Sequence, residues 1–374
     1  MSQCFAHELR SLISSDGKLR LSIDRVPIAP IEDDEVIVRI EAAPLNPSDV
    51  LNLLGAADLS TLKVVGDRIE AEVPQARLPG LSPRLDRSMP MGNEGAGVVV
   101  EAGASAQALV GRTVAIAPLG GSYATYKKLK ARDCLVLPEG TPSRSGASAF
   151  INPLTVLGMI TTMRREGHSA LVHTAAASNV GQMLNRLCLA ENIPLVSIVR
   201  NPTQVELLRS QGATHVVDSS TEDFRTALVE AIAATGATLA FDAIGGGRMA
   251  ATILAAMEQV CRRSLTTYSR YGSPVHKQVY IYGGLDPGPR IIEGDLGMAW
   301  GVGGWLVMWF LSTLDPAEVG ALRARVASEL NTTFASHYTA EISLADVLSP
   351  EVIKACTRFA TGEKYLIVPL VSRD

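Results

Sequence analysis

Cysteine is scarce in this chain and its few copies are scattered. The 374 residues include five cysteines, which lie far apart, and no two of them form a Cys-x-x-Cys pair. An odd, dispersed set of this kind argues against a disulfide framework and against a structural zinc lobe. It is typical of a protein kept in a reducing compartment, and we expect a cytoplasmic location.

The chain also lacks a basic excess and a long apolar run. Lys and Arg number 34 against 38 Asp and Glu, which gives a net charge of −4 and no electrostatic footprint for nucleic acid. The most apolar segment, Leu296–Leu311, is shorter than the ~20 residues that a membrane span needs, so we expect buried core or a subunit interface there and no membrane partner. The first residues hold His7, Glu8 and Arg10 where a signal peptide would be apolar.

What the chain has in quantity is hydrophobic residues, 47% of the total, over a length that favours two domains. Strand patterns lie at residues 18–43 and in glycine-separated runs between 95 and 130, which indicates a mostly antiparallel β domain. Residues 55–90 look like a long loop that holds at most a short helix. From about residue 142 short apolar strands alternate with helices, the pattern of a doubly wound parallel sheet of the Rossmann type.

Glycine is sparse where that sheet should bind a nucleotide. The segment Ala170–Gly181 has a strand, a loop of small residues and a helix start, but it keeps only Gly181 of the usual three glycines. Small side chains let the backbone approach a pyrophosphate, whose charge the helix N-terminus then holds. We predict that the cofactor contacts this loop through Ala177, Ser178, Asn179, Val180 and Gly181.

A carboxylate is missing from the end of the second strand of this region. Sites for NAD place Asp or Glu there to bond the ribose hydroxyls, whereas this chain has Arg200. A guanidinium suits a 2′-phosphate, which favours NADPH as the cofactor. The alternative is that Arg200 is an ordinary solvent-exposed loop residue.

Two further loops follow strands of the same predicted sheet, Phe241–Gly247 and Tyr280–Leu285. Ligands of such sheets bind at the carboxyl ends of the strands. The predicted walls of the nicotinamide pocket are therefore Ile244, Gly245, Tyr282, Gly283 and Gly284, although glycines there also suit simple turns.

Several strings, in order along the chain, resemble one family. They are APLNPSDVLNLLG (43–55), MGNEGAGVVVEAG (91–103), GSYATY (121–126), NPLTVLGMI (152–160), GGWLVMW (303–309) and GEKYLIVPL (362–370). They resemble the zinc-independent branch of the medium-chain dehydrogenase/reductase superfamily, in particular quinone oxidoreductases and mitochondrial-type 2-enoyl thioester reductases.

The resemblance implies an α/β fold in which a Rossmann domain is inserted into a GroES-like, mostly antiparallel β catalytic domain. We place the catalytic domain at residues 1–143 and 311–374 and the NADP-binding domain at 144–310. The resemblance also implies a homodimer.

Three positions depart from the zinc-dependent relatives. The zinc-dependent relatives carry cysteine or histidine at the positions where this chain has Asn46, Asn93 and Ile151, and none of these three residues ligates zinc well. We therefore expect no metal. A metal-free site cannot polarise an alcohol for oxidation, but it can pass hydride to an alkene that a carbonyl already activates.

A tyrosine is missing as well. The resemblance implies a Tyr shortly after the NPSD segment, where it supports protonation of the reduced carbon, but residues 55–90 contain none. Either another group or water donates this proton, or the substrate is a quinone that needs no protonation at carbon.

The candidate residues each have a structural alternative. Asn46 is the candidate catalytic group, donating a hydrogen bond to the substrate carbonyl, or it is only a turn former before Pro47. By resemblance Thr155 contacts the nicotinamide, or else it caps a helix. Asn93 and Trp305 are assigned to the substrate cleft. Tyr123 is interpreted as packing and His173 as a satisfied core histidine.

The sequence thus predicts an NADPH-dependent reductase that acts on a small conjugated carbonyl compound: a quinone, an enone or enal, or a 2-enoyl thioester. The alternative, from another class, is an NADPH-binding protein with little or no catalysis, of the crystallin or adaptor type.

Overall fold

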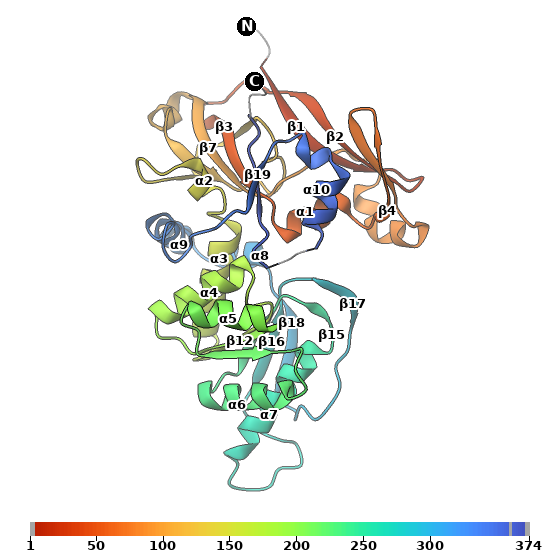
Figure 1. Cartoon of the computed structure of the whole chain (residues 1–374). Coiled ribbons are helices and arrows are strands. Elements are labelled where there is room, and N and C mark those ends of the chain that lie inside the picture. The colour runs from red at the N-terminus through yellow and green to blue at the C-terminus, as the bar shows by residue number, and fades with distance from the viewer. Residues whose placement is uncertain (1–3, 359–360, 371–374) are drawn as a thin grey trace. The chain divides into compact units, whose positions relative to one another are not determined.

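The computed structural model describes residues 4–358 and 361–370, and it shows two compact units (Figure 1). The first, here the β unit, comprises Met1–Ile151 and Arg323–Asp374, and the second, the Rossmann unit, comprises Asn152–Leu322. The divisions fall inside helices α3 (Ile151–Arg165) and α9 (Pro316–Ser328), later in the chain than the boundaries predicted after residues 143 and 310. The change from strand patterns to helix patterns in the sequence marks the approach to a helix. It does not show at which residue of that helix one unit ends and the other begins.

The β unit is built on two sheets. The five-stranded sheet has the order β4-β5-β2-β1-β6, and all its pairings are antiparallel. Its strands are β1 (Phe5–Ile13), β2 (Lys18–Pro27), β4 (Asp58–Val65), β5 (Arg68–Glu72) and β6 (Met89–Pro90).

The seven-stranded sheet has the order β10-β8-β7-β3-β20-β19, with β9 also paired to β3. Only β19 and β20 run parallel to each other. The strands are β3 (Glu35–Pro44), β7 (Gly95–Ala102), β8 (Thr113–Ile116), β9 (Tyr126–Lys130), β10 (Cys134–Val136), β19 (Ala340–Ile342) and β20 (Tyr365–Ile367). One apolar core joins residues of both sheets, as the predicted antiparallel domain requires.

The segment 55–90 is not the irregular loop that its scattered Pro and Gly suggested. It forms the hairpin β4–β5, a 3₁₀ segment (Gln75–Arg84) and the short strand β6. The hairpin turns at Gly66 and Asp67, with Val65 paired to Arg68 and φ of +64° at Gly66. A two-residue turn containing glycine between strands is a hairpin signal, and the polar, exposed character of β4 hid it.

Short helices fill the rest of the β unit: α1 (Pro47–Leu54), α2 (Ser143–Gly146) and α10 (Pro350–Cys356). Helix α1 begins where Pro47 occupies the first helical turn, where a missing N–H costs nothing. It ends at Gly55, whose φ is +58°. Its start carries the NPSD string into the interior of the unit.

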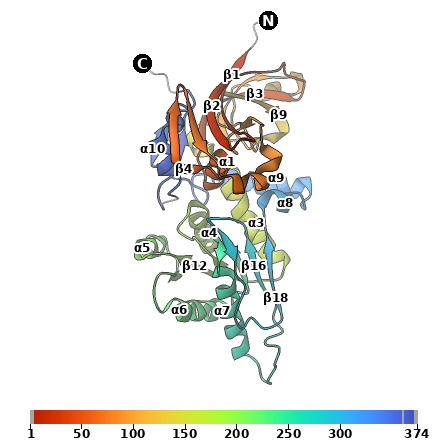
Figure 2. The same cartoon turned by 90° about the vertical axis from the view of Figure 1, so that its right-hand side faces the viewer.

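The Rossmann unit has a six-stranded sheet in the order β13-β12-β11-β14-β16-β18, parallel throughout. The strands are β11 (Leu171–His173), β12 (Leu195–Val199), β13 (His215–Asp218), β14 (Leu239–Asp242), β16 (Lys277–Ile281) and β18 (Trp300–Gly304). The helices that connect these strands in the sequence are α4 (Asn179–Ala190), α5 (Pro202–Ser210), α6 (Phe224–Thr235) and α7 (Met249–Arg263). Figure 2 shows them together with strands β12, β16 and β18. The predicted fold class is confirmed.

The apolar run Leu296–Leu311 divides between core and surface. It forms the edge strand β18 and helix α8 (Val307–Leu311), in which Val307 and Phe310 are buried. Met298 is 75% exposed and Trp309 69% exposed, so the run is only partly core. Within residues 4–358 and 361–370, none of the helices combines the length and apolar character needed to cross a membrane.

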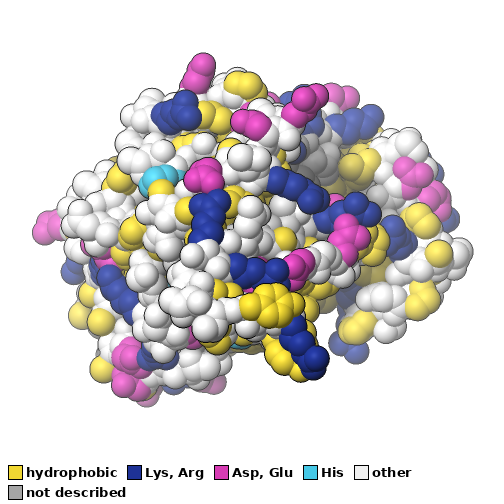
Figure 3. Space-filling view, turned by 90° about the horizontal axis from the view of Figure 1, so that it is seen from below, with side chains coloured by type: hydrophobic (Ala, Val, Ile, Leu, Met, Phe, Trp, Pro, Cys, Tyr) yellow, Lys and Arg dark blue, Asp and Glu magenta, His cyan; other side chains and the backbone are white. Residues whose placement is uncertain are grey.

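The face in Figure 3 shows basic and acidic side chains interspersed, with apolar groups between them. No continuous basic field is visible on this face. The mixture of charges agrees with the near balance of Lys and Arg with Asp and Glu in the composition.

Candidate active site

The small-residue loop of the Rossmann unit leads directly into the start of α4. Ser178 is the N-cap of α4, and its side chain accepts a hydrogen bond from the Gly181 N–H at 3.2 Å. A Cβ at Gly181 would lie 2.2 Å from the Ala176 carbonyl oxygen, so only glycine lets the helix approach its own loop this closely. Ala177 is buried, whereas Asn179 and Val180 are half-buried at the helix start. The predicted loop residues are thus together at one helix N-terminus.

The loops after β14 and β16 lie against each other, as their assignment to one pocket required. A Cβ at Gly245 would lie 2.6 Å from the Gly283 carbonyl oxygen, and a Cβ at Gly283 would lie 2.5 Å from that of Ala243. Two backbones in contact leave no room for side chains. Ile244 and Tyr282 flank this contact as half-buried residues, and Gly284 is exposed.

A buried carboxylate that the sequence analysis missed organises these loops. Asp242, fully buried at the end of β14, accepts hydrogen bonds from the N–H groups of Ile244 (2.9 Å) and Gly245 (3.2 Å). It also accepts one from the Thr174 hydroxyl at 2.6 Å. The Thr174 oxygen in turn accepts from the Ala243 N–H at 2.8 Å. Through Thr174, Asp242 therefore connects the loop after β11 to the loop after β14. Its position at a strand end was the available signal.

His173 is buried as predicted, but it is only half satisfied. Its Nε2 lies 2.8 Å from the Tyr282 hydroxyl, while Nδ1 has no hydrogen-bond partner in the described part of the chain. Burial lowers the pKa of His173 to about 3, so the ring is neutral at physiological pH. The rings of His173 and Tyr282 stack with their centroids 5.7 Å apart. Because Tyr282 is the first residue after β16, this contact holds the start of the loop that follows β16.

Arg200 follows β12 immediately and its side chain is exposed. Its backbone N–H donates to Oε1 of Gln204 at 2.9 Å, and the next residue, Asn201, caps α5 by accepting from the Gln204 N–H. The guanidinium is therefore carried by a backbone that the capped helix holds in place. Both the cofactor role and the solvent-exposed role fit this location.

In the β unit, Asn46 belongs to a buried polar cluster. Only 4% exposed, it donates from Nδ2 to Oε1 of Glu94 at 2.9 Å. Its backbone N–H donates to Oδ2 of Asp49 at 3.0 Å, and Oδ1 of Asp49 accepts from the Asn93 N–H at 2.9 Å. The NPSD and GNEG strings thus meet through two buried carboxylates, neither of which the sequence analysis singled out.

A buried lysine and two hydroxyls lie in the same unit. The Lys364 Nζ donates to Ser148 Oγ at 2.7 Å, and that oxygen lies 2.8 Å from the Tyr338 hydroxyl. Nζ also lies 5.3 Å from the centre of the Tyr338 ring, a favourable place for a cation. The three residues come from far apart in the chain, so no local motif announces them.

Burial dominates the protonation of this cluster. Together with a smaller contribution from the Glu94 charge, it raises the pKa of Asp49 to about 7, against the N–H groups that Asp49 accepts from. Burial likewise raises the pKa of Glu94, opposed by the nearby Lys364 charge. It lowers the pKa of Lys364 to about 8, opposed by the charges of Glu94 and Asp49. The carboxylates and the ammonium therefore depend on one another for their ionised forms.

The remaining predicted residues lie in both units. Thr155 is buried within α3. Trp305 packs edge-on to Phe241 with centroids 5.4 Å apart, and its Nε1 donates to Thr162 Oγ1 at 3.1 Å. Tyr123 is fully buried and donates to the Pro44 carbonyl at 2.8 Å, which agrees with a packing role. Asn93 is half-buried, and its backbone is held by Asp49.

The positions of the absent zinc ligands can be compared directly. Asn46 and the Ile151 N–H both donate to Glu94, the latter at 2.8 Å, so these two positions hydrogen-bond to one carboxylate. Within residues 4–358 and 361–370 there is no group of three or more His, Cys, Asp or Glu side chains placed to hold a metal ion.

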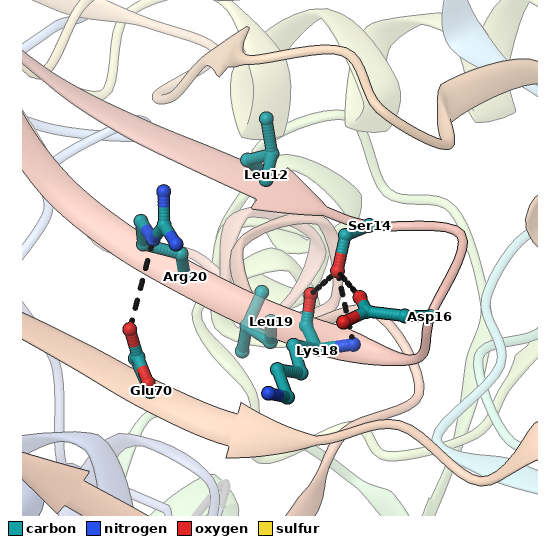
Figure 4. Close-up of a pocket in the computed structure, with 7 residues that line it drawn as sticks. All are labelled: Leu12, Ser14, Asp16, Lys18, Leu19, Arg20 and Glu70. Carbon is teal, nitrogen blue, oxygen red and sulfur yellow. Dashed lines mark hydrogen bonds and ion pairs between the residues drawn. The ribbon is translucent and has the colours of Figure 1, made fainter.

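A pocket of about 190 Å³ lies on the five-stranded sheet, lined by residues of the β1–β2 turn region and β5 (Figure 4). Two pairs of its polar groups interact: Arg20 forms an ion pair with Glu70 at 3.7 Å, and the Ser14 hydroxyl bonds to Asp16. It shares no lining residue with the clusters above. We assign it no function.

Residues 32–149 match the family model of the alcohol dehydrogenase GroES-like domain. The mitochondrial enoyl-[acyl-carrier-protein] reductase of Xenopus tropicalis is 28% identical over 205 residues, which are 53% of this chain and 51% of that protein. The synaptic vesicle membrane protein VAT-1 homolog of Rattus norvegicus is 27% identical over 225 residues, 59% of this chain and 49% of that one. The matched regions span about half the length of these curated relatives.

Among solved structures, a putative NADPH:quinone reductase from Mesorhizobium loti aligns over 98% of both chains, with a TM-score of 0.72 and 24% identity. This likeness establishes the fold along the whole chain. Together with the domain match, it confirms the resemblance found in the sequence: the chain has the fold of the medium-chain dehydrogenase/reductase superfamily, with an alcohol dehydrogenase GroES-like domain at residues 32–149.

Proposed function

We propose that this protein is an NADPH-dependent reductase that passes hydride to a conjugated carbonyl compound without the help of a metal. The observation that carries the proposal is the loop before α4, where Ser178 caps the helix and Gly181 allows the close backbone approach that a pyrophosphate needs. The substrate class, a quinone, an enone or enal, or a 2-enoyl thioester, is supported by the names of the relatives, which include enoyl and quinone reductases.

The Rossmann unit fits the cofactor. Helix α4 has twelve residues and presents its first N–H groups beside small side chains, which suits the pyrophosphate. The loops of Ile244, Gly245, Tyr282, Gly283 and Gly284 would border the nicotinamide, and Thr155 would contact it. NADPH, when bound, supplies the hydride; the protein's own groups hold and orient the reactants.

Arg200 is the proposed selector of NADPH over NADH. Replacing Arg200 with Ala is expected to weaken NADPH binding by ~1.5–3 kcal/mol, the range for a hydrogen bond to a charged group, and to leave NADH binding nearly unchanged. Titration calorimetry with both cofactors measures this. Arg209→Ala, which removes an exposed arginine at the other end of α5, is the matched control and should change neither affinity. Equal affinities of the unaltered protein for the two cofactors would refute the assignment.

On the substrate side we propose Asn46 as the hydrogen-bond donor to the reacting carbonyl. Negative charge grows on that oxygen as hydride arrives at the β-carbon, so a donor held in place stabilises the transition state more than the ground state. Asn93 and Trp305 stay assigned to the substrate cleft. For an alkene substrate the proton comes from another group or from water, since the Tyr123 hydroxyl donates to the Pro44 carbonyl inside the core.

A panel of quinones, enones and enoyl thioesters, followed by the loss of NADPH absorbance, tests the proposal directly. Turnover of at least one class is expected, with no stoichiometric zinc in the active protein. The rival function is an NADPH-binding protein with little or no catalysis, of the crystallin or adaptor type. A protein that binds NADPH tightly and reduces nothing in the panel would favour the rival.

The homodimer and the cytoplasmic location stay predictions. Strand β18 is an edge of the six-stranded sheet, and α8 beside it exposes Met308 and Trp309, which suits a subunit contact. Sedimentation equilibrium of the purified protein would test the dimer.

A further inference from the structure

The carboxylate of Glu94 lies directly behind the proposed donor Asn46, and both of its oxygens are engaged. Oε1 accepts from Asn46 Nδ2 at 2.9 Å, and Oε2 accepts from the N–H groups of Phe150 (3.0 Å) and Ile151 (2.8 Å). Glu94 itself is fully buried. We propose that Glu94 is a positioning residue that fixes the orientation of the Asn46 carboxamide; this rests on the proposed function.

The chemistry of the carboxamide and the carboxylate explains this role. A carboxamide has an acceptor end and a donor end of nearly equal shape, so its orientation is set by its partners: the capping box of α1 pairs the Asn46 side chain with the Asp49 backbone, and its donor end bonds to Glu94. An ionised carboxylate only accepts hydrogen bonds, so the NH₂ end of Asn46 must face Glu94. One of its two N–H groups is used there, and the second keeps a fixed direction, available for a substrate carbonyl. A carboxamide turned around would offer that carbonyl an oxygen, which repels it.

The ionisation of Glu94 depends on what surrounds it. The titratable groups that act on it are Asp49 in α1, Lys364 before β20, and the buried phenols of Tyr123 and Tyr338. Burial raises the pKa of both tyrosines, so they are neutral. Asp49 repels a second negative charge, which leaves Lys364 as the cation that favours the charged form of Glu94.

Protonation would undo the arrangement. Because Oε2 already accepts two backbone N–H groups, a proton on Glu94 would sit on Oε1 and face Asn46. Asn46 would then turn its oxygen toward Glu94 to accept that proton. Loss of the Lys364 charge and neutralisation of Glu94 should therefore have the same consequence for the donor.

Glu94→Gln tests this without altering size. The oxygen of the new amide is required by the Phe150 and Ile151 N–H groups, so its NH₂ must face Asn46, which is forced to turn around. We expect kcat to fall tenfold or more, approaching the loss of a whole oxyanion donor, while the Kd for NADPH stays unchanged. Glu258→Gln in the Rossmann unit, another buried and ion-paired carboxylate, is the control; it should lower stability but leave kcat alone.

A reciprocal exchange separates positioning from mere stability. In the double variant Asn46→Asp/Glu94→Gln the new amide donates to the new carboxylate, so the buried hydrogen bond is restored with donor and acceptor exchanged. Aspartate is also a good N-cap for α1. We expect the melting temperature lost in Glu94→Gln to be largely regained, while kcat stays low because no donor is left at position 46. A purely structural Glu94 predicts that rate and stability return together, and that result would overturn the proposal.

Lys364→Met provides the pH readout. Without the ammonium, Glu94 takes up a proton at higher pH than in the unaltered protein, so the acidic limb of the kcat profile should move upward and activity should recover as pH rises. An unshifted profile in a folded variant, or a Glu94→Gln rate within twofold of the original, contradicts the proposal. If no panel compound is reduced, the proposed function fails by itself, whereas the coupling of positions 46 and 94 in melting temperature still shows whether their hydrogen bond forms.

Discussion

Asn46→Ala is expected to lower kcat by about 100-fold or more on every substrate that the protein reduces, with little change in the Kd for NADPH. The lost interaction is strongest when the carbonyl oxygen carries developing negative charge, and removing one such donor costs on the order of 100- to 1,000-fold in rate. Asn46 is only 4% exposed in the β unit, and a donor in so dry a place is worth more than one that water can replace. Steady-state kinetics on the best panel compound, together with NADPH titration, measures both quantities.

The control for this variant must account for the start of α1. Asn46 is the N-cap of that helix, and losing a cap commonly costs ~0.5–2 kcal/mol of stability. The backbone N–H at position 46 still donates to Asp49 after the substitution, so the helix start keeps one of its bonds. Ser349→Ala removes the cap of α10 in the same unit and should lower stability without lowering kcat. A folded Asn46→Ala variant with the original rate on all active compounds would make Asn46 purely structural.

The Rossmann unit was predictable because its signals are local. Each strand is a short buried run, such as LVSIV in β12 with all five residues buried, and each is followed by a helix pattern. Right-handed crossovers leave few ways to arrange such a series, and the parallel six-stranded order follows. The loop of small residues was visible for the same reason, since its strand, loop and helix are consecutive.

The hairpin β4–β5 was not predicted because its residues carry no alternating apolar pattern. Strand β4 lies at the edge of its sheet and is exposed or half-buried along its length, so packing places little demand on its side chains. Edge strands with polar residues are difficult to distinguish from loops in a sequence. Only Gly66 and Asp67 at the turn marked it.

The polar cluster around Asn46 shows the limit more sharply. Asp49 and Glu94 belong to the NPSD and GNEG strings, which carry the family resemblance. Their neighbours in the sequence do not show that both carboxylates are buried and joined through Asn46. Lys364 is 270 positions further along the chain than Glu94. Contacts of that separation are created by sheet pairing, here of β20 with β3, and not by spacing along the chain. Asp242 was missed for a related reason, because a carboxylate at a strand end can equally face solvent.

The largest effect on stability is expected in the Rossmann unit, from Lys277→Met. Lys277 is fully buried and forms an ion pair with Glu258, which is 1% exposed. Glu258 also accepts from Arg262 Nε at 2.7 Å and from the Ser273 N–H at 2.9 Å. It is packed so closely that a Cβ at Gly272 would meet its carboxylate at 2.2 Å, so the group cannot move out to water. Breaking a buried pair leaves an uncompensated charge and costs about 3–5 kcal/mol, here toward the lower figure because Arg262 remains.

The pH dependence identifies the cause. Burial alone would raise the pKa of Glu258, but its bonds to Lys277, Ser273 and Arg262 outweigh burial and hold the pKa below its ordinary value of 4.5. The charged form therefore stabilises the fold above that value, and this contribution is lost as pH falls through the lowered pKa. Without Lys277 the pKa of Glu258 rises. The free energy of unfolding of the variant is therefore lowered only at pH values at which Glu258 is charged. The difference in unfolding free energy between the two proteins should be largest above the raised pKa of Glu258 in the variant, and it should shrink as pH falls from there to the lowered pKa of Glu258 in the unaltered protein. Adding Glu258→Gln to Lys277→Met removes the stranded charge and should recover part of the loss at neutral pH. A difference that is constant across this pH range would show that lost packing of the lysine stem, and not the stranded charge, sets the cost.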